Sequence, residues 1–337
     1  MISFIQFAVI RATLAALTLL TVSFIVFSLM ELVPGTCAER YLAFKNTQGS
    51  SITVEDIRAE EKRLGLDRPF AIRFGEWVYN VVVKGDFGDS CILRMNINEL
   101  IGDRFLISLG IASAALVVSY IIAIPVGIIS ATTEYKSLDL FLKLISYLGL
   151  ALPSFLVALC IMLFSTIFFG DTMTGLFSPE YEKADWSIDK FWDFLSRAWL
   201  PIVVLGWNAT AFTLQTVRAL MLDENDKLYV MAAKARGVSG FSLLWKYPAR
   251  HSMGPVINSV GFDLNRVFSF LPVVALIMIL TESGYLLIEA LARTNDQQLA
   301  GAIIFLLTAS IITINFVSDI LLAIIDPRIR KGVLVGN

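Results

Sequence analysis

The most distinctive pattern of functional residue types in this sequence lies in the segment 226–251. Its small and apolar residues recur at i, i+3, i+4 and i+7: Leu228, Met231, Ala232 and Ala235. This spacing predicts a short helix that ends at Gly237, and Phe241 begins a second apolar face after the glycine turn. Small alanines beside cations let a helix press its backbone into a groove on another protein. The segment therefore indicates docking to a partner.

Polar residues within long apolar stretches form a second group of candidates: Asn208, Gln215, Asp263 and Arg266. Asn208 and Gln215 are seven residues apart and share one helix face. Asp263 and Arg266 can pair at i, i+3 spacing, and charges inside a membrane are costly unless they are paired or face a cavity. We expect this charged pair to line a translocation path near the inner gate. Hydrogen bonding that only joins helices is the alternative for all four residues.

The cysteines and the single histidine, His251, bear on metal and redox chemistry. The three cysteines lack the CxxC or Cys/His clustering of a zinc or iron site, so we expect no metal site. Cys37 and Cys91 are predicted to lie outside the membrane, where disulfides persist. We predict a bridge between them that ties a long loop down at both ends; two free buried thiols are the alternative.

Apolar helices must position all of these residues. The 337-residue chain is 56% hydrophobic and 17% charged, which is more apolar than a soluble core of this size requires. A bilayer core of about 30 Å needs roughly 20 apolar residues per helix. Six stretches qualify: about 9–31, 105–130, 138–169, 199–220, 257–281 and 300–325. The sequence therefore predicts an all-α integral membrane protein with six transmembrane helices, of which the third is long enough to tilt or break.

The distribution of Lys and Arg predicts the orientation of these helices. The segments that carry most of the cations, including 226–251, belong on the cytoplasmic side, together with both termini. The predicted organisation is an N-terminal helix, an extracytoplasmic loop region, a transmembrane core and a cytoplasmic tail: 1–31, 32–103, 104–326 and 327–337. The loop region is too long for a simple turn, so we expect it to be partly folded, with a helix starting at Thr53.

Several motifs carry a resemblance to a known family. Ala232-Ala233-x-x-x-Gly237 resembles the EAA coupling loop of binding-protein-dependent ABC permeases, in the form found in the dipeptide and oligopeptide family, first-permease (B-type) subunit. Met231 stands in place of the glutamate that gives the loop its name. Further similarities to this family occur in order along the chain: Leu64–Phe70, Gly85–Ser90, Leu152–Phe155, Asp319 and Asp326–Arg330. The resemblance covers nearly the whole chain.

One stretch departs from the family pattern. After the fifth apolar stretch the family has an acidic residue followed by Phe-x-x-Pro-Gly, whereas this sequence has Ala275, Met278 and Thr281-Glu282. The resemblance therefore does not assign the residues of an outer gate.

The resemblance implies a type I ABC importer permease in a bacterial plasma (inner) membrane. Its implied partners are a second homologous permease, two ABC ATPase subunits, an extracytoplasmic solute-binding protein and the lipid bilayer, and not nucleic acid. ATP and Mg²⁺ are expected on the ATPase subunits, so this chain is expected to have no cofactor and no catalytic activity. The residues expected to couple to the ATPases are Leu228, Met231, Ala232, Ala233, Lys234, Arg236, Gly237, Phe241 and Arg250.

Peptides are the expected cargo, and three alternatives remain. The same machinery imports oligosaccharides, opines or nickel complexes in other members of the family. An ion-coupled secondary transporter would need midplane carboxylates, for which Asp263 is the single candidate. Gly237-Val-Ser239-Gly240 is similar to the GxSG of rhomboid intramembrane proteases, but a nucleophilic serine needs a base fixed beside it in a membrane site, and this segment is predicted to be cytosolic.

Overall fold

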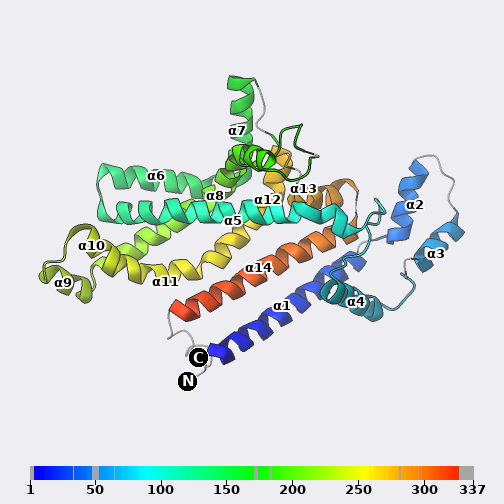
Figure 1. Ribbon diagram of the computed structural model, residues 1–337, viewed down its shortest axis with the longest axis horizontal. Helices are drawn as coiled ribbons and strands as arrows, with labels where there is room; N and C mark the ends of the chain where they lie inside the picture. Colours follow the sequence, from blue (N-terminus) through cyan, green and yellow to red (C-terminus); the bar gives the residue numbers. More distant parts are fainter. Residues whose placement is uncertain are drawn as a thin grey trace. The chain divides into compact units, whose positions relative to one another are not determined.

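The computed structural model describes residues 4–32, 34–47, 53–63, 65–170, 174–182, 184–280, 282–294 and 296–325. Regular structure in these ranges is helical, apart from an isolated bridge between Asp89 and Asn96 (Figure 1). The predicted tail 327–337, the Asp326–Arg330 motif, Leu64 and Thr281 lie outside the described residues.

The long apolar helices coincide with the stretches predicted to span a membrane. Five helices of the described chain are long and apolar enough by themselves: α1 (Phe4–Leu32), α5 (Ile97–Thr132), α8 (Ile188–Asn225), α12 (Val260–Met278) and α14 (Gln297–Ile325). A sixth candidate is the pair α6 (Ser137–Ala151) and α7 (Ser154–Phe169), whose axes are bent by 100°. Each predicted stretch overlaps one of these six, which confirms the all-α membrane class.

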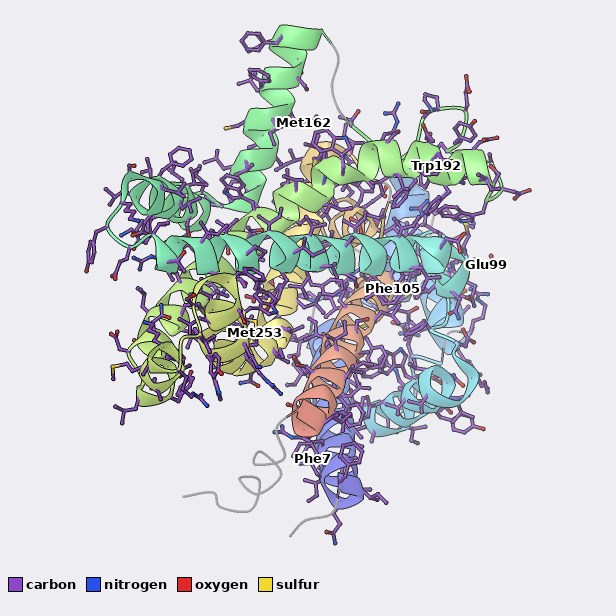
Figure 2. The ribbon with its side chains drawn as sticks, turned by 60° about the vertical axis from the view of Figure 1, so that its left-hand side comes forward. Phe7, Glu99, Phe105, Met162, Trp192 and Met253 are labelled. Atoms are coloured by element: carbon purple, nitrogen blue, oxygen red, sulfur yellow. A yellow bond between two sulfur atoms is a disulfide. The ribbon has the colours of Figure 1, made fainter. Side chains whose placement is uncertain are left out.

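The break between α6 and α7 has a local cause. Proline disfavours helical backbone angles in the residue before it, and Leu152, which precedes Pro153, is extended at φ −92° and ψ 116°. Pro153 then caps the start of α7. The side chains of α7, around Met162 in Figure 2, are largely apolar and exposed, with Leu163 at 63% and Phe168 at 67%. Such a surface requires lipid or another protein to cover it.

The described residues form two compact units, which we treat separately. The first lies within Met1–Arg11, Ser108–Leu280 and Ile314–Asn337, and the second within Ala12–Ile107 and Thr281–Thr313. The first unit contains α6, α7, α8 and α12 together with most of α5, and it holds both groups of predicted site residues.

Small residues let the helices of the first unit approach closely around α8. A Cβ atom added to Gly206 would lie 2.7 Å from the hydroxyl of Ser119 on α5. A Cβ atom added to Gly149 on α6 would lie 2.6 Å from the Cβ of Ala211. Close packing through Gly, Ala and Ser is typical of helices that associate within a membrane.

The second unit shows that the loop after the first apolar helix is folded. It contains α2 (Cys37–Thr47), α3 (Val54–Arg63), α4 (Phe70–Tyr79), η1 (Asn80–Lys84), α13 (Ser283–Ile288) and η3 (Glu289–Arg293). Phe70 and Phe74 of α4 pack against Phe24 of α1, with ring centroids 5.8 and 5.4 Å apart. The aromatic face of α4 therefore packs on α1.

Two local features of the second unit answer questions raised by the sequence. Cys37 and Cys91 form a disulfide, with their Cα atoms 5.5 Å apart, so the predicted bridge is present and the free-thiol alternative is not. Glu282, in the stretch that departs from the family pattern, is fully buried and caps α13 by accepting hydrogen bonds from the backbone N–H groups of Gly284 and Tyr285.

The helix predicted to start at Thr53 is also present. Thr53 and Asp56 form a reciprocal cap at the start of α3: the backbone N–H of each is bonded to the side chain of the other. The hydrogen bonds from Thr53 lower the pKa of the Asp56 carboxyl.

Candidate functional site

The segment 226–251 folds as the helix, glycine turn and second helix that its spacing predicts. α9 (Leu228–Ala235) follows directly on α8, and α10 (Gly240–Leu244) continues through η2 (Trp245–Ala249) into α11 (Arg250–Asn258). Gly237 has φ +84°, a left-handed conformation that disfavours residues with a Cβ atom. The backbone N–H of Val238 bonds to the carbonyl of Ala233 at 3.2 Å and closes the C-terminus of α9. We call residues 226–251 the coupling hairpin.

The inner face of the coupling hairpin is a small apolar core. Val230, Ala233 and Leu243 are buried against one another, and Tyr229 and Val238 pack around them. Ala233, which the sequence placed among the docking residues, is fully buried. It therefore holds the hairpin together and does not reach its outer surface.

The outer face of the coupling hairpin carries large exposed apolar side chains. Leu228 is 80% exposed, Phe241 76%, Trp245 52% and Met231 48%. The rings of Phe241 and Trp245 are stacked, with centroids 5.9 Å apart. A solvated loop helix would present polar residues here, whereas clustered exposed apolar groups indicate a binding surface. Exposed residues of the predicted docking set accompany them: Ala232, Lys234, Arg236, Gly237 and Arg250.

Ionisable side chains fix the coupling hairpin to the end of α8. The Tyr229 hydroxyl donates a hydrogen bond to the carboxylate of Glu224, and Lys227 lies 3.3 Å from the same carboxylate. Burial and the neighbouring Glu224 charge raise the pKa of Tyr229 above its ordinary value, so it remains a hydrogen-bond donor at neutral pH. His251 packs its ring on Tyr229 with centroids 4.8 Å apart. The histidine thus has a packing contact within the hairpin, and both it and Ser239 are exposed.

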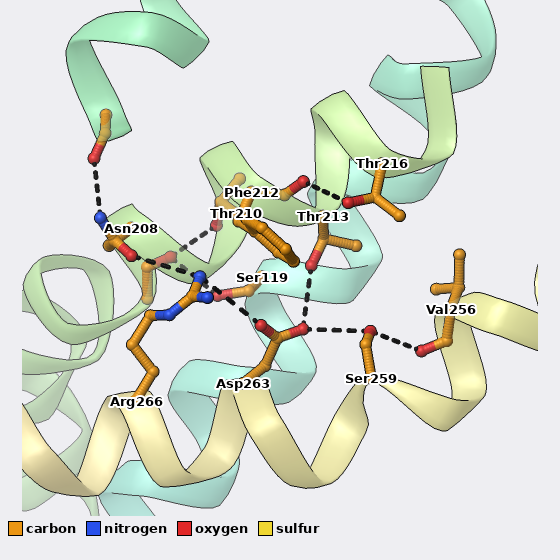
Figure 3. A network of polar contacts seen from close by, with 12 residues as sticks. Ser119, Asn208, Thr210, Phe212, Thr213, Thr216, Val256, Ser259, Asp263 and Arg266 are labelled. Atoms are coloured by element: carbon orange, nitrogen blue, oxygen red, sulfur yellow. Dashed lines mark hydrogen bonds and ion pairs between the residues drawn. The ribbon is translucent and has the colours of Figure 1, made fainter. Parts of the chain in front are cut away.

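A polar network between α5, α8 and α12 contains three of the four predicted path residues, Asn208, Asp263 and Arg266 (Figure 3). Asp263 on α12 is fully buried, and its Oδ2 accepts a hydrogen bond of 2.8 Å from the hydroxyl of Tyr120. The hydroxyls of Thr213 and Ser259 each lie 3.4 Å from the same oxygen. Oδ1 is buried without a hydrogen bond within the described chain, and its nearest cation is Arg266 Nη1 at 3.7 Å. Asp263 is therefore incompletely satisfied.

Arg266 extends this network toward α6. Its Nη1 lies 3.4 Å from Asn208 Oδ1, and its guanidinium lies over the Phe212 ring, 4.3 Å from the centroid. Asn208 in turn donates a 3.2 Å hydrogen bond to the carbonyl of Gly149. Three predicted path residues, Asn208, Asp263 and Arg266, are thus brought together. The fourth, Gln215, lies apart from them, and its buried Nε2 has no hydrogen-bond partner in the described part of the chain.

The structure adds residues that the sequence did not single out. Tyr120 on α5, Thr213 on α8 and Ser259 in the turn between α11 and α12 supply hydroxyls to Asp263. Hydroxyl residues are common in apolar helices, and only the fold shows that these converge on one carboxylate. Within the described ranges, no group of three or more His, Cys, Asp or Glu side chains could hold a metal ion.

Comparison with known proteins identifies the family. Residues 123–331 match the model of the "Binding-protein-dependent transport system inner membrane component", and residues 4–111 match the model of the N-terminal part of such membrane components. The chain belongs to this family. It is an ABC importer permease that passes through the membrane several times, as the apolar helices require.

Individual relatives support the same assignment. A Brucella suis protein described as a peptide permease is 29% identical over 315 residues, which cover 93% of this chain and 95% of that protein. The "Peptidoglycan transport system permease protein YejB" of Agrobacterium fabrum is 31% identical over 294 residues, covering 85% of this permease and 78% of the relative.

A solved structure supports the fold. The MetNI methionine ABC transporter in an inward-facing conformation has a chain that matches with a TM-score of 0.54 at 15% identity. The match covers 68% of this permease and 97% of that chain.

Proposed function

We propose that this permease forms half of a path for di- and oligopeptides across a bacterial inner membrane, driven by ATP hydrolysis on separate subunits. The observation that carries the proposal is the outer face of the coupling hairpin, where Phe241 and Trp245 are stacked and exposed on a segment that also exposes the cations Lys234 and Arg236. Exposed aromatic residues next to cations suit a groove on a partner protein. The peptide cargo is supported by the relatives named as peptide permeases.

The proposed assembly contains a second permease, two ATPase subunits that bind ATP and Mg²⁺, and an extracytoplasmic binding protein that delivers cargo. This chain then needs no cofactor or catalytic group of its own. The termini and the coupling hairpin are proposed to face the cytoplasm. The loop region 32–103 is proposed to face the oxidising side, where a bridge between Cys37 and Cys91 is stable.

The proposed mechanism depends on a hairpin that is fixed to α8 and bound by an ATPase subunit. Closure of the ATPases around ATP moves the coupling hairpin, and α8 moves with it because the two are continuous in the chain. The permease then changes from an inward-facing to an outward-facing cavity, and hydrolysis resets it. The Asp263–Arg266 pair lies on α12 and contacts Thr213 and Asn208 of α8, which moves with the hairpin, so we expect the pair to line or gate the path.

The decisive experiment is uptake of a labelled tripeptide by vesicles that contain the complete transporter with its binding protein. Uptake should require ATP and should be abolished in the Phe241→Ala/Trp245→Ala variant, which should also lose its ATPase subunits on purification. Trp192→Ala is the matched control, because Trp192 is a 63% exposed tryptophan near the start of α8, far along the chain from the hairpin (Figure 2).

Each contrary outcome has a defined meaning. Uptake driven by an ion gradient without ATP would make the chain a secondary transporter. Competition by an oligosaccharide, an opine or a nickel complex, with none by peptides, would retain the importer and replace its cargo. Retention of the ATPase subunits by the double variant would remove the docking role of the hairpin.

A further inference from the structure

A second buried carboxylate, Asp139, lies at the end of the first unit where α8 leads into the coupling hairpin. It is 0% exposed and accepts hydrogen bonds from five donor atoms. Arg218 binds it through Nε at 2.8 Å and Nη2 at 3.0 Å. The Ser130 hydroxyl lies 2.6 Å away, the Lys143 ammonium 3.0 Å and the backbone N–H of Tyr135 3.2 Å. We call these five residues the Asp139 cluster.

Only one member of the Asp139 cluster connects distant parts of the sequence. Ser130, Tyr135 and Lys143 lie within nine residues of Asp139, on the end of α5, the following turn and α6. Arg218 is 79 residues away, on α8. The two-point contact between a guanidinium and a carboxylate fixes orientation as well as distance. The Asp139–Arg218 pair is therefore the link of the cluster that resists sliding of α6 along α8.

The position of Arg218 connects this link to the coupling hairpin. Arg218 precedes the end of α8 at Asn225 by seven residues, which is about 10 Å of helix at 1.5 Å per residue. Its neighbour Val217 is buried in an apolar cluster with Ala249, near the end of the hairpin, and with Val256 of α11, which follows the hairpin. The cytoplasmic end of α8 is thus held by the last part of the hairpin and by α11 as well as by Asp139.

The other end of α6 is joined to α8 next to the polar network. The Ser146 hydroxyl donates a 3.0 Å hydrogen bond to the carbonyl of Ala211. Gly149 allows the backbone of α6 to approach Ala211, and its own carbonyl accepts the hydrogen bond from Asn208 that continues to Arg266. α6 is therefore attached to α8 at both ends, from the Asp139 cluster to the Asp263–Arg266 network, and it ends at the Pro153 bend.

We infer that Asp139 is a positioning residue that makes α6 follow the movement of the coupling hairpin. This inference rests on the proposed function, because it assumes that ATPase subunits move the hairpin. When the cytoplasmic end of α8 moves, Arg218 moves with it and pulls Asp139 through the ion pair. The whole of α6 then shifts, including Gly149 and the Pro153 bend beside the proposed cargo path. Without the ion pair, only the far end of α6 is bonded to α8, so the end that carries Asp139 lags when α8 moves and ATP is hydrolysed without transport.

The test measures the number of peptides transported per ATP hydrolysed in vesicles with the complete transporter and its binding protein. The variants are Asp139→Asn, Arg218→Met and the double variant Asp139→Asn/Arg218→Met. Lys143→Met is the matched control, because it removes a cation from the same carboxylate but breaks only contacts within α6 and the turn before it. The ratio does not depend on how much protein folds, so a purely structural role of Asp139 would leave it unchanged.

We expect each single variant to lower the ratio at least tenfold, and the double variant to lower it no further, since all three break the same link. Lys143→Met should stay within twofold of the wild type. If Asp139→Asn does not assemble, the double variant provides the measurement, because it leaves no buried guanidinium without its carboxylate. A wild-type ratio in an assembled Asp139→Asn or double variant would overturn the inference. Absence of ATP-dependent uptake by the wild type would instead overturn the proposed function.

Discussion

Asp139 and Asp263 are both fully buried carboxylates of the same unit, yet their surroundings differ. Asp139 uses both oxygens, with two cations within 3.0 Å and a bidentate guanidinium. One oxygen of Asp263 accepts a 2.8 Å hydrogen bond, and the only cation near the other oxygen among the described residues is Arg266, 3.7 Å away. A saturated buried carboxylate fixes a structure, whereas an incompletely satisfied one has contacts left to gain in another conformation. We therefore expect Asp139 to hold its helices in a fixed arrangement, and the contacts of Asp263 to change between conformations.

The largest expected effect is the loss of stability in Asp139→Asn, which tests the rigid role of Asp139. Asp139→Asn leaves Arg218 and Lys143 without their anion, and their side chains are only 14% and 19% exposed. Loss of one partner from a buried pair costs about 3–5 kcal/mol. Thermal unfolding in detergent should show this loss relative to the wild type. A melting temperature equal to that of the wild type would mean that the cluster contributes nothing to the fold.

The next effect tests the changing environment at Asp263. Asp263→Asn and Arg266→Gln should each reduce peptide uptake about tenfold, equivalent to ~1.4 kcal/mol, because the charged pair changes its contacts during the transport cycle. Their effect on thermal stability should be small, since the two charges are 3.7 Å apart and Oδ1 of Asp263 accepts no hydrogen bond within the described chain. Transport and stimulated ATP hydrolysis that remain unchanged in both variants would leave the pair with a structural role alone.

The last two variants remove one hydroxyl from each carboxylate and are compared by their free energy of unfolding. Tyr120→Phe removes the 2.8 Å hydrogen bond to Asp263 and should destabilise the protein by about 1.5–3 kcal/mol, the usual value for a bond to a charged group. Ser130→Ala removes a 2.6 Å bond, but four donors to Asp139 remain, so we expect about 1 kcal/mol or less. Denaturant titration of the two variants should give this order, and the reverse order would contradict the comparison.

The sequence predicts features that depend on neighbouring residues. The coupling hairpin is visible from helical spacing and Gly237, and the Asp263–Arg266 pair from its i, i+3 spacing. The break in the third span follows from the length of the stretch and from Pro153. Each of these is a property of one helix or one turn, so a single stretch of sequence contains the information.

Other features depend on distant contacts and could not be predicted. Asp139 and Arg218 are 79 residues apart, and no periodicity connects them. From the sequence alone, Arg218 is simply one of several cations on the predicted cytoplasmic side. The available signal was Asp139 itself, a carboxylate at the start of an apolar stretch, which requires a partner if it is buried. The burial of Ala233 likewise depends on Leu243 of the second helix, which helical spacing within α9 does not reveal.

The stacked pair Phe241 and Trp245 also has a consequence for the life of the chain before assembly. In the proposed assembly an ATPase subunit covers these two side chains, so a newly made permease without that subunit leaves both more than half exposed. Chaperones and proteases recognise such surfaces, so a permease without its ATPase subunit should be degraded, whereas one bound to that subunit should persist. The amount of this permease in a cell should therefore follow the supply of its ATPase, without any need for matched synthesis.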